Sequence, residues 1–302
     1  MRVKGLLNYG LQVPSLEVGQ DFFSGFGLQV TERDDALAIR CEGRELDQAV
    51  LTEGRGKQLQ FVTFAVDPGS LPDWQRHLEG TGVSLRDAPV RAGTGGLWFA
   101  DPDGILVNLR DDELASWRKA APEESRFNFG DDIQRVDQAR WMLADAPASP
   151  RRLSHMLMFS SDMARSEHFY TSVLGLRLSD RITGMATFLN SGAGDHHVFG
   201  FIQSTHPGLH HSSWEVTNFD QMAVGARTMQ ERGYQEGWGL GRHTLGSNLF
   251  HYIRDPWGSW VEYSADMDRI TEDWKPSDWD IPPAVWCPMP PETFVANLEE
   301  RA

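Results

Sequence analysis

The chain of 302 residues carries 28 basic and 43 acidic side chains, so its net charge is −15. This charge argues against nucleic-acid and anionic-membrane partners, which need a basic surface, and two cysteines are too few for a disulfide framework. No apolar run approaches the ~20 residues of a membrane span, and the N-terminal sequence turns polar too soon for a secretory signal, so we expect a cytoplasmic protein.

The length suggests about two domains, and the chain repeats itself on that scale. In the first half, a predicted strand at 7–13 leads into an amphipathic helix at 18–27. A second alternating strand, at 58–66, leads into a helix-like stretch that ends on glycine (RHLEGTG). The sequence DPDG at 101–104 then predicts a tight turn, because Pro suits the second turn position and Gly the fourth.

The second half repeats the same elements in the same order. Its predicted strands lie at 153–159 and 208–216, a helix lies at 165–175, and a second DPxG turn lies at 255–258. We therefore predict an α+β fold with two domains, each of paired βαβββ modules that form an open, barrel-like mixed sheet around the site. The predicted boundaries are 1–115 for the N-terminal domain and 150–266 for the C-terminal domain.

Two further segments lie outside these domains. The linker, residues 116–149, is rich in charge, Ala and Pro, and we predict a surface helix from Asp132 to Met142. The C-terminal segment, residues 267–302, carries Trp274, Trp279 and Trp286 among several prolines. Because isolated aromatic residues mostly bury area, we expect this segment to pack as a strap on the C-terminal domain. A cover over a pocket is the alternative.

The ten histidines are distributed unevenly, with only His77 in the first half and nine between 155 and 251. Aligning the two halves places His155 opposite Tyr9, His211 opposite Phe61 and Glu262 opposite Asn108. Packing alone would favour similar residue types in both halves, so this asymmetry favours function. Two imidazoles and one carboxylate on three strands are the facial triad of non-heme Fe(II), and Mn(II) accepts the same ligands.

Other polar residues gather near the predicted triad in the sequence. His196 and His197 follow a glycine-rich turn, and His243 precedes the strand that leads to the second DPxG turn. Strand alternation puts Tyr252 on the opposite side from His251. The alternation cannot be followed through the turn to Glu262, so the sequence pattern does not decide whether Tyr252 lies on the same face as Glu262.

These residues carry a resemblance to a known family. The motif LSHM at 153–156, the HH pairs at 196–197 and 210–211, and the segment GRHTLGSNLFHYIRDPWGSWVEY resemble the type I extradiol ring-cleaving dioxygenases of the vicinal oxygen chelate superfamily. The resemblance implies a metal-free N-terminal domain and a metal-binding C-terminal domain. It implies that His155, His211 and Glu262 bind the metal, that His197, His243 and Tyr252 are catalytic, and that His210 is not a ligand.

The implied activity is Fe(II)-dependent extradiol cleavage of a catechol-type aromatic with O2, giving a ring-opened hydroxy-dienoate in aromatic catabolism. His197 would act as the acid–base residue, while His243 and Tyr252 would hydrogen-bond the substrate oxygens. By the same resemblance we expect a small aromatic diol as the partner and a homo-oligomer.

Three other activities compete with this interpretation. A glyoxalase-like isomerase or metal-dependent thiol transferase would assemble its site from two modules that both donate ligands. A metal-free binding protein would have no use for the triad. A 2-oxo-acid-dependent dioxygenase fits the ligand spacing less well. We also predict that conservative changes at Tyr9 and Phe61 leave metal content unaffected.

Overall fold

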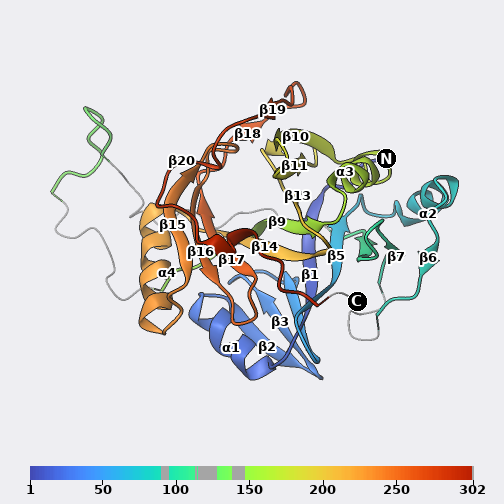
Figure 1. Cartoon of the computed structure of the whole chain (residues 1–302), viewed down its shortest axis with the longest axis horizontal. Coiled ribbons are helices and arrows are strands. Elements are labelled where there is room, and N and C mark those ends of the chain that lie inside the picture. Colours follow the sequence, from blue (N-terminus) through green and yellow to red (C-terminus); the bar gives the residue numbers. More distant parts are fainter. Residues whose placement is uncertain (90–94, 113, 115–127, 138–146, 301–302) are drawn as a thin grey trace.

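The N-terminal half forms one eight-stranded sheet built from two βαβββ modules. The computed structural model describes residues 1–89, 95–112, 114, 128–137 and 147–300 (Figure 1). The first module comprises β1 (Gly5–Val13), α1 (Leu16–Gly25), β2 (Gln29–Arg33), β3 (Ala36–Arg40) and β4 (Ala49–Glu53). The second comprises β5 (Gln58–Ala65), α2 (Leu71–Gly80), β6 (Leu85–Arg86), β7 (Leu97–Ala100) and β8 (Leu106–Arg110).

The C-terminal half repeats this plan in a ten-stranded sheet. Its first module comprises β9 (Arg152–Ser160), α3 (Met163–Ser172), β10 (Arg177–Ile182), β11 (Ala186–Asn190) and β13 (Phe199–Gln203). Its second comprises β14 (Gly208–Glu215), α4 (Phe219–Glu231), β15 (Gly237–His243), β16 (Leu249–Arg254) and β17 (Trp260–Ala265). The smaller elements are β12 (Gly194–Asp195), β18 (Arg269–Ile270), β19 (Asp278–Trp279), β20 (Ala284–Trp286) and the 3-10 helix η1 (Glu292–Val295).

The strand order is the same in both halves and shows the paired modules directly. The orders β2-β3-β4-β1-β5-β8-β7-β6 and β10-β11-β13-β9-β14-β17-β16-β15 place the first strands of the two modules side by side and antiparallel. In Figure 1 the C-terminal sheet curves, and α4 packs against β16 and β17. The predicted α+β fold of paired βαβββ modules is confirmed. The predicted domain boundaries remain our proposal.

Local sequence explains where helices and turns form. Helices α1, α3 and α4 each begin after a residue whose side chain accepts a hydrogen bond from the backbone three residues later; these are Ser15, Asp162 and Asn218. In both DPxG turns the aspartate Oδ1 accepts backbone N–H groups two and four residues on, at Asp101 and Asp255. The turn glycines, Gly104 and Gly258, have φ values of 89° and 92°, which glycine adopts without strain.

The two halves share one hydrophobic core. The rings of Phe26 and Tyr263 stack with centroids 3.8 Å apart, and the Tyr263 hydroxyl donates to the Phe26 carbonyl over 2.8 Å. Phe64 packs edge-on against Phe199 at 5.1 Å. Strand β9 is buried on both of its faces, because one face packs against this core and the other lines a pocket.

The strand register corrects one column of the sequence alignment. The pairs Phe61–Leu106 and Thr63–Asn108 correspond to His211–Trp260 and Ser213–Glu262, as the alignment predicts. His155, however, pairs with Ser213, whereas Asn8 pairs with Thr63, so Asn8 and not Tyr9 is the counterpart of His155. A one-residue shift moves a side chain to the other face of the sheet. The counterparts Asn8, Phe61 and Asn108 still form no metal triad.

Tyr9 instead supports the centre of the fold. Its ring is buried, and its hydroxyl donates to Ser212 Oγ over 3.1 Å, which joins the two halves beside His211. We expect Tyr9→Phe to lower the free energy of unfolding by about 1 kcal/mol, because one buried hydrogen bond is lost. Urea unfolding of the metal-free protein would measure this loss. Metal content should equal that of wild type, and a Tyr9→Phe protein that binds less metal would contradict this prediction.

The structure describes only part of the linker. Residues 132–137, which begin the predicted surface helix Asp132–Met142, contain no helix; Asp132 forms an isolated bridge with Phe129, and Asp137 has a φ of 55°. Ile133 and Val136 are exposed, so no apolar surface stabilises a helix there. Residues 138–142 lie outside the described residues. Among the helices that are described, none is long and apolar enough to cross a membrane.

Candidate metal centre

Three buried side chains from neighbouring strands converge on one point inside the C-terminal sheet. His155 lies on β9, His211 on β14 and Glu262 on β17, and one ligand atom from each lies within 4.8 Å of the others. In the described part of the chain this is the one group of three or more His, Cys, Asp or Glu side chains with that geometry. The strand order β9-β14-β17 brings the three residues together, as the sequence predicts.

Two of the three ligand atoms in this cluster are buried without a hydrogen bond, and the third ligand atom faces one of them. His155 Nε2 lies 3.0 Å and His211 Nε2 lies 3.7 Å from Glu262 Oε2. Both His211 Nε2 and Glu262 Oε2 are buried without a hydrogen bond. Because an unpaired buried polar atom is costly, such atoms mark a place for a ligand. Two imidazoles and one carboxylate suit a divalent Fe or Mn ion, so the residues fit the implied metal.

Electrostatics favour the charge states that metal ligands need. Burial lowers the pKa of His211 well below its ordinary value, and the neighbouring His210 adds to this effect, so the ring is neutral. Burial by itself would raise the pKa of Glu262, but the neighbouring His155 outweighs this effect and holds that pKa below its usual range. Glu262 is therefore ionised. Asn248, which is fully buried, also donates to Glu262 Oε1 over 3.3 Å.

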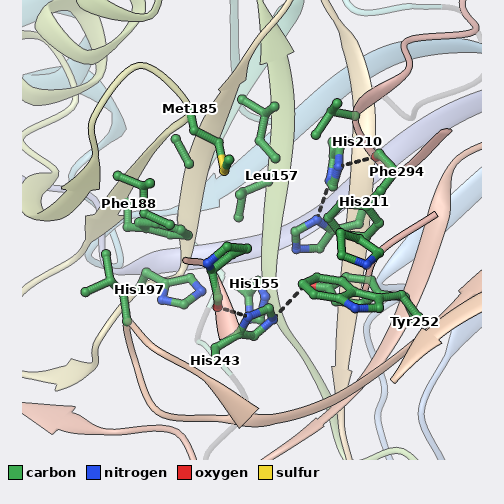
Figure 2. A pocket seen from close by; sticks show the side chains of 18 of the residues that line it. His155, Leu157, Met185, Phe188, His197, His210, His211, His243, Tyr252 and Phe294 are labelled. Carbon is green, nitrogen blue, oxygen red and sulfur yellow. Dashed lines mark hydrogen bonds between the residues drawn. The ribbon is translucent and has the colours of Figure 1, made fainter. Parts of the chain in front are cut away.

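The three predicted catalytic residues line the same pocket. His197 packs against His155, with ring centroids 4.5 Å apart. Tyr252 on β16 lies directly opposite Glu262 on β17, so the two side chains lie on the same face of the sheet, which strand alternation alone could not decide. His243 Nε2 lies 3.0 Å from the Tyr252 hydroxyl. Figure 2 shows His155, His197, His243 and Tyr252 on one side of the pocket, with Met185 on the other.

Hydrogen bonds fix how His243 and Tyr252 are arranged. His243 Nδ1 lies 3.0 Å from the Pro283 carbonyl, which can only accept, so Nδ1 carries the hydrogen. In the neutral ring Nε2 then accepts the hydrogen of the Tyr252 hydroxyl, and the oxygen of Tyr252 keeps its lone pairs for a further donor. Burial raises the pKa of Tyr252 well above its ordinary value, and the nearby Glu262 adds to this shift, so the hydroxyl stays protonated.

The pocket is a cavity of about 240 Å3 that the C-terminal segment helps to close. Residues Pro290, Phe294 and Val295 of that segment form part of its wall. The segment also packs on the C-terminal domain, where Trp274 Nε1 donates to the Ser179 carbonyl over 2.8 Å. The segment therefore packs against the C-terminal sheet and also forms a wall of the pocket. The sequence singled out the tryptophans of this segment, but it gave no indication that Phe294 lines the pocket.

The remaining histidines lie in different surroundings. His196 and His210 are buried beside His197 and His211. His251 is buried on the opposite side of β16 from Tyr252 and does not line the pocket. Sequence reasoning gave no role to His196, His210 or Asn248, because their importance depends on which atoms they face.

Comparison with known proteins agrees with this geometry. A sequence model of the Glyoxalase/Bleomycin resistance protein/Dioxygenase superfamily matches residues 5–109 and 152–263. The chain belongs to this superfamily. The resemblance to its extradiol ring-cleaving dioxygenases is also confirmed, because the chain is 36% identical to Metapyrocatechase 2 of Cupriavidus necator, over 98% of this chain and 93% of that protein.

Proteins with lower sequence identity are also similar to this chain. The 2,2',3-trihydroxybiphenyl dioxygenase of Sphingomonas paucimobilis is 25% identical, over 85% of this chain and 86% of that protein. Among solved structures, the 2,3-dioxygenase LapB from Pseudomonas sp. KL28 superposes with a TM-score of 0.75 at 22% identity, over 92% of this chain and 98% of that one. A Mn(II)-bound glyoxalase from Novosphingobium aromaticivorans superposes with a TM-score of 0.73 at 22% identity, over 92% of this chain and 87% of that one. At these identities the structures support the fold.

Proposed function

We propose that this superfamily member is an Fe(II)-dependent dioxygenase that cleaves catechol-type diols beside the two hydroxyl groups. The observation that carries the proposal is the buried triad of His155, His211 and Glu262. Two of its ligand atoms, His211 Nε2 and Glu262 Oε2, have no hydrogen bond, and both histidines line an apolar pocket. The identity to Metapyrocatechase 2 over nearly the whole chain supports the same activity. Both atoms of O2 would enter the product, a ring-opened hydroxy-dienoate.

The metal, when bound, would ionise the diol and bring it and O2 to adjacent positions. The residues around it would handle hydrogen bonds and protons. His197 Nδ1 faces His196, so Nε2 is the atom left to exchange a proton with the substrate. The Tyr252 oxygen would accept a hydrogen bond from a substrate hydroxyl, and His243 would hold Tyr252 in place. The apolar walls would exclude bulk water.

The pocket lining indicates the class of diol. No Lys, Arg, Asp or Glu lies among the described residues that line the pocket; apart from the histidines and Tyr252 they are apolar, and include Leu157, Ile182, Met185, Phe188, Ile202 and Leu245. An anionic substituent would be buried without a cationic partner, which is costly. A cavity of ~150 Å3 holds one benzene ring, so about 240 Å3 leaves room for a substituent. We propose diols that carry an alkyl or aryl group.

Oxygen uptake by anaerobically prepared, Fe(II)-loaded protein tests the proposal. We expect one O2 consumed per diol with a coloured ring-fission product, and kcat/KM for 3-methylcatechol at least about 10-fold above that for 3,4-dihydroxybenzoate, because an unpaired buried carboxylate costs several kcal/mol. A Mn(II)-loaded sample compares the two metals. Bound metal without oxygen uptake would contradict the dioxygenase proposal, and equal turnover of both diols would contradict the apolar substrate class.

A further inference from the structure

His210 is the extra residue of a bulge in β14. The pairing of β14 with β9 shifts between Leu209 and His211, so His210 has no partner of its own in the ladder. A bulge re-aims side chains, and here it lets two successive imidazoles meet. His210 Nδ1 lies 2.6 Å from His211 Nδ1, with both rings buried (Figure 2).

The other nitrogen of His210 determines which ring donates in this hydrogen bond. His210 Nε2 lies 2.9 Å from the carbonyl oxygen of Phe294, which can only accept, so Nε2 carries a hydrogen. The neutral His210 ring then offers only a lone pair at Nδ1, and His211 must donate its Nδ1–H. His211 Nε2 is consequently left with its lone pair, directed at the position that Glu262 Oε2 also faces.

The second histidine pair repeats the arrangement. His196 Nδ1 lies 3.1 Å from His197 Nδ1, and His196 Nε2 lies 2.9 Å from Asp180 Oδ2. The other oxygen of Asp180 accepts the Ser277 backbone N–H over 2.8 Å and Trp279 Nε1 over 2.9 Å. In both pairs, therefore, the first histidine donates from Nε2 to an oxygen, and the C-terminal segment either provides that oxygen or holds it.

We propose that His210 and His196 are positioning residues, each of which fixes the tautomer and orientation of the next histidine through one Nδ1–Nδ1 hydrogen bond. His210 prepares His211 Nε2 to bind the metal. His196 directs His197 Nε2 into the pocket. The proposal rests on the proposed function for the roles of His211 and His197, but the tautomers it assigns are properties of the metal-free protein.

Nitrogen-15 NMR of the metal-free protein tests these tautomers without reference to activity. We expect His211 and His197 each to carry hydrogen on Nδ1, and His210 and His196 on Nε2. Replacing His210 with leucine should release His211 from this single tautomer. A wild-type spectrum with hydrogen on His211 Nε2 would overturn the assignment for the first pair, and hydrogen on His197 Nε2 would overturn the second.

Metal titration tests the consequence for His210. We expect His210→Leu to raise the metal dissociation constant about 10- to 100-fold, the usual cost of removing a partner of a metal ligand. His210→Gln, which keeps a donor and an acceptor, should recover part of this loss. His206→Leu is the matched control, because His206 Nε2 likewise faces a carbonyl of the C-terminal segment, that of Glu299 at 2.8 Å, but lies away from the triad. Equal affinities in all four proteins would overturn the role of His210.

Steady-state kinetics test the role of His196. We expect His196→Leu to bind metal as tightly as wild type and to lose kcat on the order of 10²-fold with little change in KM, because a misplaced catalytic group costs about this much. A loss of metal affinity, or an unchanged kcat, would overturn the positioning role. Wild-type protein that binds no metal or cleaves no diol would instead contradict the proposed function, which separates the two failures.

Discussion

Glu262→Ala should abolish tight metal binding, with a dissociation constant raised by more than about 100-fold. Mutating a residue that hydrogen-bonds a metal ligand lowers metal affinity about 10- to 100-fold, and removing the one anionic ligand itself should lower it further. Glu262 also provides the only carboxylate of the triad. An imidazole binds a metal ion through a neutral lone pair, so two histidines alone cannot balance the charge of a buried dication. His155→Ala and His211→Ala should lose metal in the same way.

The measurement can separate lost binding from lost folding. A ligand that binds only the native state stabilises that state. At a free-ligand concentration 100 times the dissociation constant, the free energy of unfolding rises by about 2.7 kcal/mol. Wild type should therefore melt at a higher temperature with metal, and Glu262→Ala should not. The matched control is Asn108→Ala, at the equivalent position of the N-terminal half, which should keep the metal-dependent gain. One metal per chain at wild-type affinity in Glu262→Ala would remove Glu262 from the site.

Sequence reasoning predicted the fold and the triad because both depend on repetition. The two DPxG turns and the paired strands repeat about 150 residues apart, and three chemically special residues stand out against that background. Glu262 follows closely after its DPxG turn in the sequence, so the matching turns fix the alignment of β17 with β8. Alignment of β1 with β9 had no such nearby turn, and it was wrong by one residue.

Other parts of the site depend on contacts that a linear pattern does not contain. Tyr252 faces Glu262 because β16 and β17 pair in a register that the turn sets. His210 meets His211 because of a bulge, which breaks the alternation that strand predictions use. Phe294 contributes a backbone carbonyl, and a carbonyl is present in every residue, so composition gives no signal for it.

His197→Phe and His197→Gln should bind metal and substrate nearly as wild type does and should lose kcat by about 10²- to 10⁴-fold. This is the usual contribution of a positioned acid–base group, and neither replacement can take up and return a proton. Burial, with the neighbouring His155, lowers the pKa of His197 well below its ordinary value, so the free ring is neutral. Burial alone makes this ring a weak base, but an ionised diol beside it would raise its pKa and let its Nε2 lone pair take up a proton.

Two comparisons make the experiment specific to this role. His251→Gln alters another buried histidine, whose burial lowers its pKa to about 4 but which lies outside the pocket, and its kcat should match wild type. Anaerobic substrate titration and metal analysis should give wild-type values for both His197 variants, since His197 is not one of the three ligands. An unchanged kcat in His197→Gln would show that the proton passes through another group. Because His243 accepts from Tyr252, the Tyr252–His243 pair would then be the alternative path, and Tyr252→Phe would become the decisive variant.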